Sequence, residues 1–159
     1  MTGQMTATLA ERAIQAVDWT ELELASGPAR GFGESLTAFI SRDSAVPRDQ
    51  LWQSMENKVF VQDDVYSAAE PTIRVLLAAL AEPRPDDVRN GALDLLFLLV
   101  HAASFRGDEL GQRCVSAAAE GGWLLVREAM AGRTGVRDSC LEILDICAPD
   151  CARAVRMMP

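Results

Sequence analysis

Lysine is almost absent from this chain of 159 residues, in which Lys58 is the single lysine against fourteen arginines. Acidic residues outnumber basic ones, and the formal net charge is −8. An acidic surface repels phosphate, so binding to nucleic acid or to an anionic membrane is not expected. Aromatic residues make up only 6% of the chain. Sparse aromatics with abundant alanine favour closely packed helices over a β-sandwich.

Long apolar segments are also lacking. Unbroken apolar runs such as residues 95–100 are far short of the roughly 20 residues that a membrane-spanning helix needs. The first six residues, Met1 to Thr6, show neither the basic region nor the apolar region of a signal peptide. We therefore expect a cytoplasmic protein without a membrane partner.

Several catalytic and metal-binding motifs are missing. The chain has no phosphate-binding loop, no Gly-x-Ser-x-Gly elbow, no metalloprotease His-Glu pair and no Cys-x-x-Cys pair. Cys140, Cys147 and Cys151 would share one face of an unbroken helix, and Cys114 or His101 would have to complete a zinc site. Pro149 interrupts that helix, so buried, reduced cysteines are the favoured interpretation. No cofactor and no metal are expected.

Apolar residues recur at the helical period along most of the chain, and no strand-like alternation extends beyond a few residues. One domain over residues 1–159 is expected from this length. The sequence predicts helices over 5–17, 36–43, 47–59, 63–81, 87–103, 107–118, 123–130 and 136–148. Because Pro71 lies inside the fourth, a kink or a break is expected near Glu70. The helix over 87–103 is apolar on most of its circumference, so we expect it at the centre of the core.

One pattern occurs twice, 48 residues apart. Val88-Arg89-Asn90 and Val136-Arg137-Asp138 each open an apolar helix, after a short loop rich in proline or glycine and a preceding apolar helix. A helix pair that recurs at this period is typical of an α-solenoid. The two clearest repeat-like units are 63–103 and 108–148. The valine is expected in the apolar seam between helices, and the arginine at its rim.

The stretch from Glu70 to Val100 resembles a HEAT repeat. The matching residues are Pro71, Leu76, Leu77, Leu80, Glu82, Val88, Arg89, Ala92 and Leu96, and a looser match follows at Val136, Arg137, Cys140 and Leu144. The segment 51–80 is also similar to uncharacterised bacterial HEAT-like proteins, some of which are encoded near toxin genes. The resemblance implies an all-α, right-handed superhelix of HEAT/armadillo type without a sheet. It also implies a protein-binding role, in immunity or regulation.

A row of mainly polar residues is the candidate binding site. Aligning the two second helices places Asn90 over Asp138, Asp94 over Glu142 and Phe97 over Asp145, with His101 one turn further. Positions i, i+4 and i+7 lie along one helix face. The predicted partner-binding residues are Asn90, Asp94, His101, Asp138, Glu142 and Asp145. A protein with a basic surface would suit this row; the alternative is a charged face that only confers solubility.

Other side chains also have two interpretations. His101 has Asp94 on its own helix face, but seven residues span about 10 Å, too far for the hydrogen bond of a catalytic pair, so simple packing is favoured. The aromatic residues Trp52, Phe60, Tyr66 and Trp123 are either interface anchors or packing residues, and packing is favoured.

The sequence as a whole predicts a non-catalytic protein-interaction module. The alternative is a HEAT-like enzyme that acts on nucleic acid, of the kind that repairs alkylated DNA. A basic groove with aromatics would be needed for that activity, and the acidic charge argues against it. The apolar last helix is also a candidate surface for a homodimer, because the end of a solenoid requires a polar cap.

Overall fold

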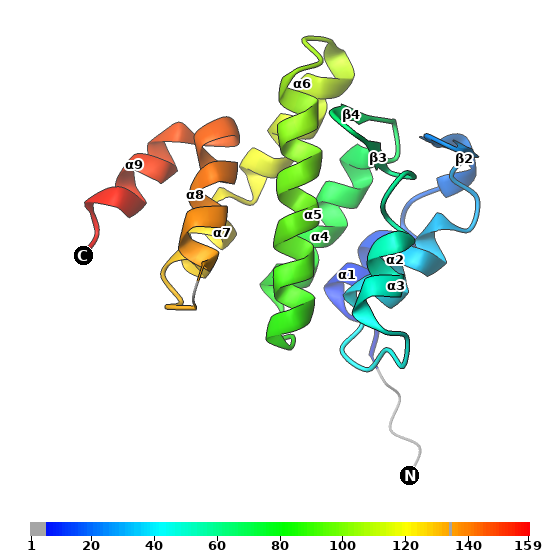
Figure 1. Ribbon diagram of the computed structural model, residues 1–159, viewed down its shortest axis with the longest axis horizontal. Coiled ribbons are helices and arrows are strands. Elements are labelled where there is room, and N and C mark those ends of the chain that lie inside the picture. The colour runs from blue at the N-terminus through cyan, green and yellow to red at the C-terminus, as the bar shows by residue number, and fades with distance from the viewer. Residues whose placement is uncertain (1–5, 134) are drawn as a thin grey trace.

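The computed structural model describes residues 6–133 and 135–159, and within them most of the chain is helical (Figure 1). The helices are α1 (Leu9–Gln15), the 3₁₀ helix η1 (Trp19–Glu21), α2 (Phe32–Ile40), α3 (Arg48–Gln53), α4 (Ala69–Ala81), α5 (Asp86–Ser104), α6 (Glu109–Glu120), α7 (Gly122–Ala129), α8 (Val136–Cys147) and α9 (Pro149–Met157). The strands are β1 (Glu23–Leu24), β2 (Gly27–Pro28), β3 (Phe60–Val61) and β4 (Asp64–Val65). No helix in these ranges is both long and apolar enough to cross a membrane.

Two small antiparallel sheets correct the predicted fold. Strand β1 pairs with β2, and β3 pairs with β4. Hydrogen bonds join the two hairpins, from the Ala25 amide to the Lys58 carbonyl at 2.8 Å and from the Ala68 amide to the Glu23 carbonyl at 3.1 Å. An all-α, right-handed superhelix of HEAT/armadillo type without a sheet is therefore wrong. The described chain is mainly helical with two hairpins in its N-terminal half, and its helices do not form a regular solenoid.

The hairpins escaped prediction for a local reason. Each strand has two residues, which is too short for an alternating pattern to be visible. Asn57 and Gln62 adopt positive φ values of 61° and 53°, a conformation expected of glycine rather than glutamine. The helix predicted from residue 63 consequently begins at Ala69. Pro71 lies in its first turn, where no hydrogen bond is lost, so no kink is required.

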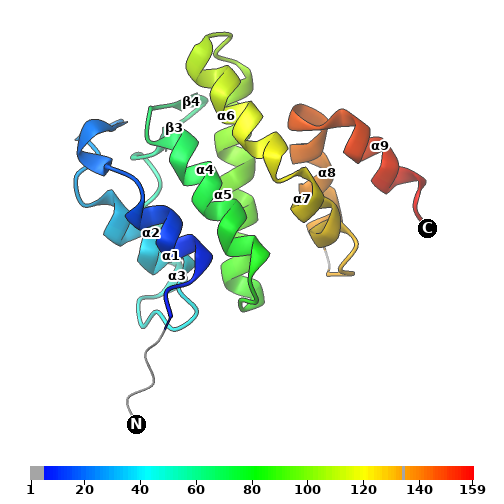
Figure 2. The ribbon, with the colours of Figure 1, turned by 180° about the vertical axis from the view of Figure 1, so that it is seen from behind.

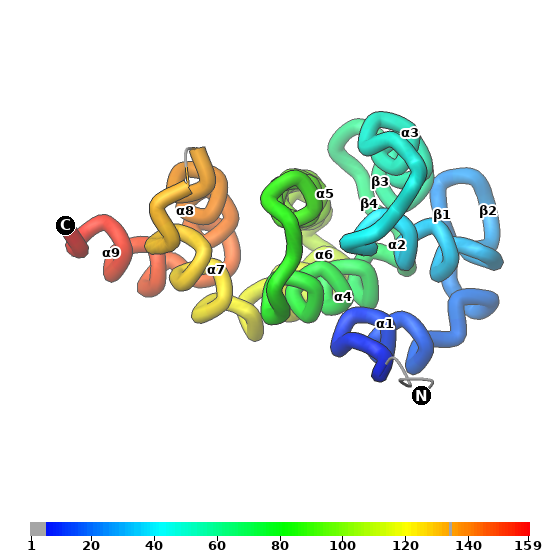
Figure 3. The backbone as a smooth tube through the Cα atoms, turned by 90° about the horizontal axis from the view of Figure 1, so that it is seen from below, coloured from blue at the N-terminus to red at the C-terminus, as the bar shows by residue number. Residues whose placement is uncertain are grey.

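The helices lie in two layers. Viewed from below, α3, α5 and α8 follow one side of the molecule, and α1, α4 and α7 follow the other (Figure 3). The view from behind shows α1, α4, α6 and α7 in front of α5 (Figure 2). Helix α5 thus has an inner side against α4 and α6 and an outer side between α3 and α8.

The core is centred on α4 and α5, and the central place of α5 was predicted from the apolar circumference of residues 87–103. Leu76 and Leu80 of α4 and Leu96 and Leu99 of α5 are all fully buried. Each such side chain contributes on the order of 1.5–3 kcal/mol by leaving water. The valines of the repeated pattern are also buried, with Val88 3% and Val136 5% exposed. Their predicted burial is confirmed, and Val136 belongs to the continuous hydrophobic core, whereas Val88 is buried outside it.

Glycine and proline set the helix boundaries in the C-terminal part. Gly121 separates α6 from α7, as the Gly121–Gly122 pair predicted, and its backbone lies so close to Leu77 that a Cβ atom would be 2.4 Å from Cδ2. Pro149, predicted to stop the helix before it, also begins α9, because proline fits the first turn of a helix. The last helix therefore turns away from α8 instead of extending it (Figure 1).

Candidate functional site

The candidate site is the outer side of α5 together with the residues of α3 and α8 that border it, here called the α5 face. It consists of Trp52 from α3, of Asn90, Asp94, Phe97, Leu98, His101 and Phe105 from α5 and its C-cap, and of Asp138, Ser139 and Glu142 from α8. Helix α5 runs vertically through the centre of Figure 1, with α8 on one side and α3 on the other. The face combines carboxylates with partly exposed apolar groups.

Asp94 lies between two surface cavities. One, of about 230 Å³, lies between α5 and α8 and is lined by Asn90, Leu93, Asp94, Gly135, Val136 and Ser139. The other, of about 310 Å³, is lined by Trp52, Asp94, Phe97 and Leu98. Apolar groups form most of the second cavity. Asp94 is the one residue among the described linings that belongs to both cavities.

The carboxylate of Asp94 has no cationic partner. In the described part of the chain, no side chain forms an ion pair with it and no donor forms a hydrogen bond to it. Its pKa is raised above the ordinary aspartate value, because neighbouring side chains remove part of its water. Asp94 is nevertheless an exposed residue, so the outer side of α5 holds a carboxylate that its neighbours shield only in part from water and that no described cation compensates.

The other predicted residues of α5 have different environments. The Asn90 side-chain oxygen accepts a hydrogen bond from Arg133 Nη1 at 3.0 Å. The His101 ring stacks on Phe97 at 5.3 Å and meets the edge of Phe105 at 4.9 Å. No described carboxylate or hydroxyl forms a hydrogen bond to the imidazole, whereas Ser104 donates to the His101 backbone carbonyl at 2.6 Å. An aromatic ladder with an exposed end at Phe105, 66% exposed, therefore continues from the cavity at Phe97.

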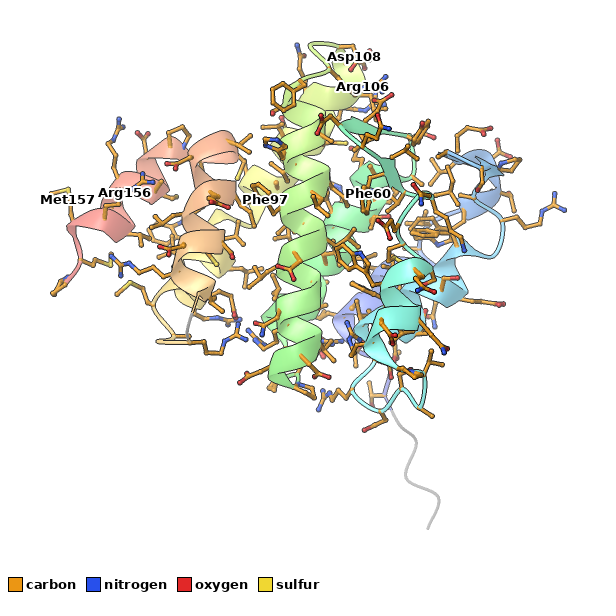
Figure 4. The ribbon with its side chains drawn as sticks, in the orientation of Figure 1. Phe60, Phe97, Arg106, Asp108, Arg156 and Met157 are labelled. Carbon is orange, nitrogen blue, oxygen red and sulfur yellow. The ribbon has the colours of Figure 1, made fainter. Side chains whose placement is uncertain are left out.

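The predicted residues of α8 also divide into two kinds. Asp138 and Glu142 are exposed and form no ion pair with another described residue. Asp145 accepts two hydrogen bonds of 2.7 Å from Arg156 of α9, which lower the Asp145 pKa. Figure 4 shows Arg156 on α9, beyond α8 and away from Phe97. Asp145 thus joins α8 to α9, while Asp138 and Glu142 face solvent.

A buried ionic cluster was not predicted from the sequence. Glu128 of α7 is only 2% exposed, and its carboxylate pairs with Arg89 of α5 and, at 2.6 Å, with Arg133. Arg89 also donates to the carbonyls of Leu80 and Glu82 at 3.2 and 3.0 Å, which satisfies the C-terminal end of α4. The arginine of the Val-Arg pattern therefore holds three helices together.

The second Val-Arg position has a similar role with different partners. Arg137 donates from Nη2 to the Val155 carbonyl of α9 at 2.9 Å. The outward side of α9 carries Asp150, Arg153 and Arg156, and next to them Met157 is 85% exposed. This end of the described chain is more polar than expected, and the homodimer stays a prediction.

The cysteines have no metal-site geometry. In residues 6–133 and 135–159, no three His, Cys, Asp or Glu side chains are grouped closely enough to hold an ion. Burial raises the pKa of Cys114 and Cys147 to about 11 and that of Cys140 to about 12. Thiols with such pKa values are almost fully protonated at neutral pH, and they pack as small apolar groups.

The aromatic residues named as packing or interface candidates also differ. Trp52 contacts Phe39 and Phe60, each with a centroid separation of 6.2 Å, so it packs while one part of it lines the cavity beside Asp94. Trp123 of α7 is 76% exposed on the opposite layer.

Comparisons with protein-family models, with curated proteins and with solved structures found no match.

Proposed function

We propose that this protein is a non-catalytic interaction module that binds a partner protein with a basic surface through the α5 face. The observation that carries the proposal is Asp94, a partly desolvated carboxylate without a described cation, placed between two cavities. Asp138 and Glu142 extend the negative charge onto α8. Complementary charge speeds association and selects partners, and apolar side chains supply most of the affinity.

The apolar part of the face supports the same proposal. Trp52, Phe97 and Leu98 are partly exposed around the second cavity, and Phe105 continues the apolar surface along α5. Partly exposed aromatic groups bordered by charges are typical of sites that bind proteins. A segment with alternating basic and apolar residues would fit this mixture.

Nucleic acid is the weaker candidate, because eight of the fourteen arginines already pair with carboxylates. The described arginines that pair with carboxylates are Arg74, Arg89, Arg106, Arg113, Arg127, Arg133, Arg153 and Arg156. Binding to phosphates would have to break these pairs at an acidic surface. An enzyme that acts on DNA therefore receives no support from the charge distribution.

Selection from a displayed library of random peptides tests the proposal. We expect the folded protein to enrich peptides that carry arginine or lysine next to large apolar residues. The combined reversals Asp138→Lys and Glu142→Lys should abolish binding of the enriched peptides. The matched control is Glu21→Lys with Glu34→Lys, which makes the same change of charge at η1 and α2, far from α8 (Figure 1).

The control is expected to bind the enriched peptides within about twofold of the unmodified protein, the difference being the general loss of attraction. Circular dichroism of all three proteins establishes that each is folded. Enrichment of acidic peptides would contradict the proposal. So would an equal loss of binding in the control and in the α8 variant.

A further inference from the structure

We propose that the cavity bordered by Trp52, Asp94 and Phe97 is a receptor for one arginine side chain of the partner. This inference rests on the proposed function and names the group that the α5 face recognises. The carboxylate lies at an edge that two cavities share, and an indole and a phenyl ring line the larger one. Such a site offers one anion and an apolar wall to the same ligand.

Arginine fits both parts of this site. Its planar guanidinium donates two parallel hydrogen bonds to a carboxylate and also stacks on aromatic rings, whereas the compact ammonium of lysine matches neither geometry as well. The apolar stem of arginine would lie against Leu98 and Phe97. The guanidinium would also compensate the negative charge of Asp94, which has no cation among the described residues.

An arginine already packs on an aromatic ring against α5 one helical turn away, although its partner is a backbone carbonyl and not a carboxylate. Arg48 of α3 lies over the Phe39 ring, 5.0 Å from its centroid, and donates to the Phe39 carbonyl at 2.8 Å. Its guanidinium crosses α5 at Gly91, where a Cβ atom would approach Nη2 to 2.6 Å. An arginine of the chain thus packs on α5 beside Gly91, whereas no described arginine pairs with Asp94 one turn further along the helix.

The other carboxylates of the face lack one of these components. Asp138 and Glu142 of α8 are exposed, as Asp94 is, but neither lines a cavity with aromatic residues. Asp145 is already bound to Arg156. Asp94 is therefore the position at which an incoming arginine would find both a free carboxylate and an aromatic wall.

Titration with short peptides tests this site directly. The probe is acetyl-Ala-Arg-Leu-Ala-amide, compared with peptides that carry citrulline or lysine instead of arginine. Citrulline keeps the shape of arginine and removes its charge. The readout is the indole N–H resonance of Trp52 in a proton–nitrogen correlation spectrum, which contains three indole signals because the chain has three tryptophans. A Trp52→Phe variant assigns the signal.

We expect the arginine peptide to shift the Trp52 resonance saturably, with millimolar affinity. The citrulline peptide should bind at least fivefold more weakly, and the lysine peptide at least threefold more weakly. Asp94→Asn should weaken binding of the arginine peptide at least fivefold. The matched neutralisation Glu34→Gln, at an exposed position of α2 outside the α5 face, should weaken it less than twofold. Unfolding curves of both variants show whether the fold is retained.

Equal affinities of the arginine and citrulline peptides would overturn the inference, as would unchanged binding by folded Asp94→Asn. The failure of this site is distinguishable from failure of the proposed function. If binding of the library peptides requires Asp138 and Glu142 but tolerates Asp94→Asn, the α5 face is still the binding surface, and the arginine site at Asp94 is refuted. If the selection does not enrich peptides that contain arginine or lysine, the proposed function itself is refuted.

Discussion

The inner and outer sides of α5 differ in whether their charged side chains have partners within the molecule. On the inner side, Arg89 meets the buried carboxylate of Glu128, and both groups are satisfied within the molecule. On the outer side, Asp94 is partly desolvated and has no cation among the described residues. The first arrangement fixes the positions of α4, α5 and α7. The second leaves an interaction unmade, which is what a binding surface requires.

The largest effect is expected on the inner side. Glu128→Ala should lower the free energy of unfolding by about 3–5 kcal/mol, because it leaves the guanidinium groups of Arg89 and Arg133 poorly solvated and without their carboxylate. Urea unfolding followed by circular dichroism measures the change. The control is Glu120→Ala, which removes the exposed pair with Arg74 and should cost about 0–1 kcal/mol. Equal losses in the two variants would contradict a structural role for the cluster.

A smaller effect is expected where α6 packs on the end of α5. A Cβ atom at Gly111 would lie 2.6 Å from the backbone oxygen of Ala103, which cannot move without displacing α5. Gly111→Ala should therefore cost about 1–3 kcal/mol. The matched variant is Gly91→Ala on the outer half of α5, where the obstacle is the movable end of Arg48. At Gly91, alanine stabilises the helix by roughly 0.5–1 kcal/mol relative to glycine, which offsets the cost of moving the Arg48 side chain. Thermal unfolding compares them, and equal costs would refute the distinction.

The corner between α5 and α6 should show a pH effect. Asp108 caps α6 and accepts hydrogen bonds from Arg106, which is labelled beside it at the top of Figure 4. These bonds lower the Asp108 pKa to about 2. Its folded pKa lies below the ordinary value of 3.8, so its stabilising contribution is present above pH 4 and is lost toward pH 2. The melting temperature of Asp108→Asn should fall below that of the unmodified protein at pH 6 and converge with it near pH 2. A constant difference across this range, measured by scanning calorimetry, would contradict the assignment.

The smallest effect, with the opposite sign, belongs to Asp94. Its folded pKa is raised, so the protein loses stability as the pH rises through the ordinary aspartate range toward that raised value. Asp94→Asn should be at least as stable as the unmodified protein at pH 7, within about 0.5 kcal/mol, and the difference should vanish below pH 4. Urea unfolding at both pH values provides the check. A variant that is clearly less stable at pH 7 would show that Asp94 has an internal partner.

The helices from α4 to α8 could be predicted because their apolar stripes are long. Leu76, Leu80, Leu96 and Leu99 repeat at helical spacing, and all are buried. The two hairpins could not, since two-residue strands carry no period and their turns include glutamine at positive φ. Those hairpins contradict the all-α superhelix that the Val-Arg pattern had suggested.

The candidate site was only partly accessible from the sequence. The spacing of Asn90, Asp94 and His101 correctly placed them along α5. It could not show which of these side chains would already be bound by neighbouring residues. Arg133 binds Asn90, and Arg156 binds Asp145, through contacts between residues 43 and 11 positions apart. Glu128 was missed because a carboxylate in an apolar stripe gives no sign of its buried partner. The cavity at Asp94 depends on Trp52, which α3 brings from 42 positions earlier.

Amide hydrogen exchange with and without a library-selected basic peptide tests the central claim most directly. On binding, we expect slower amide exchange in α3, α5 and α8. Exchange in α4 and α6, on the opposite layer, should be unchanged (Figure 2). Protection confined to α1, α4 and α6, with none in α5 or α8, would contradict the assignment of the α5 face as the binding surface.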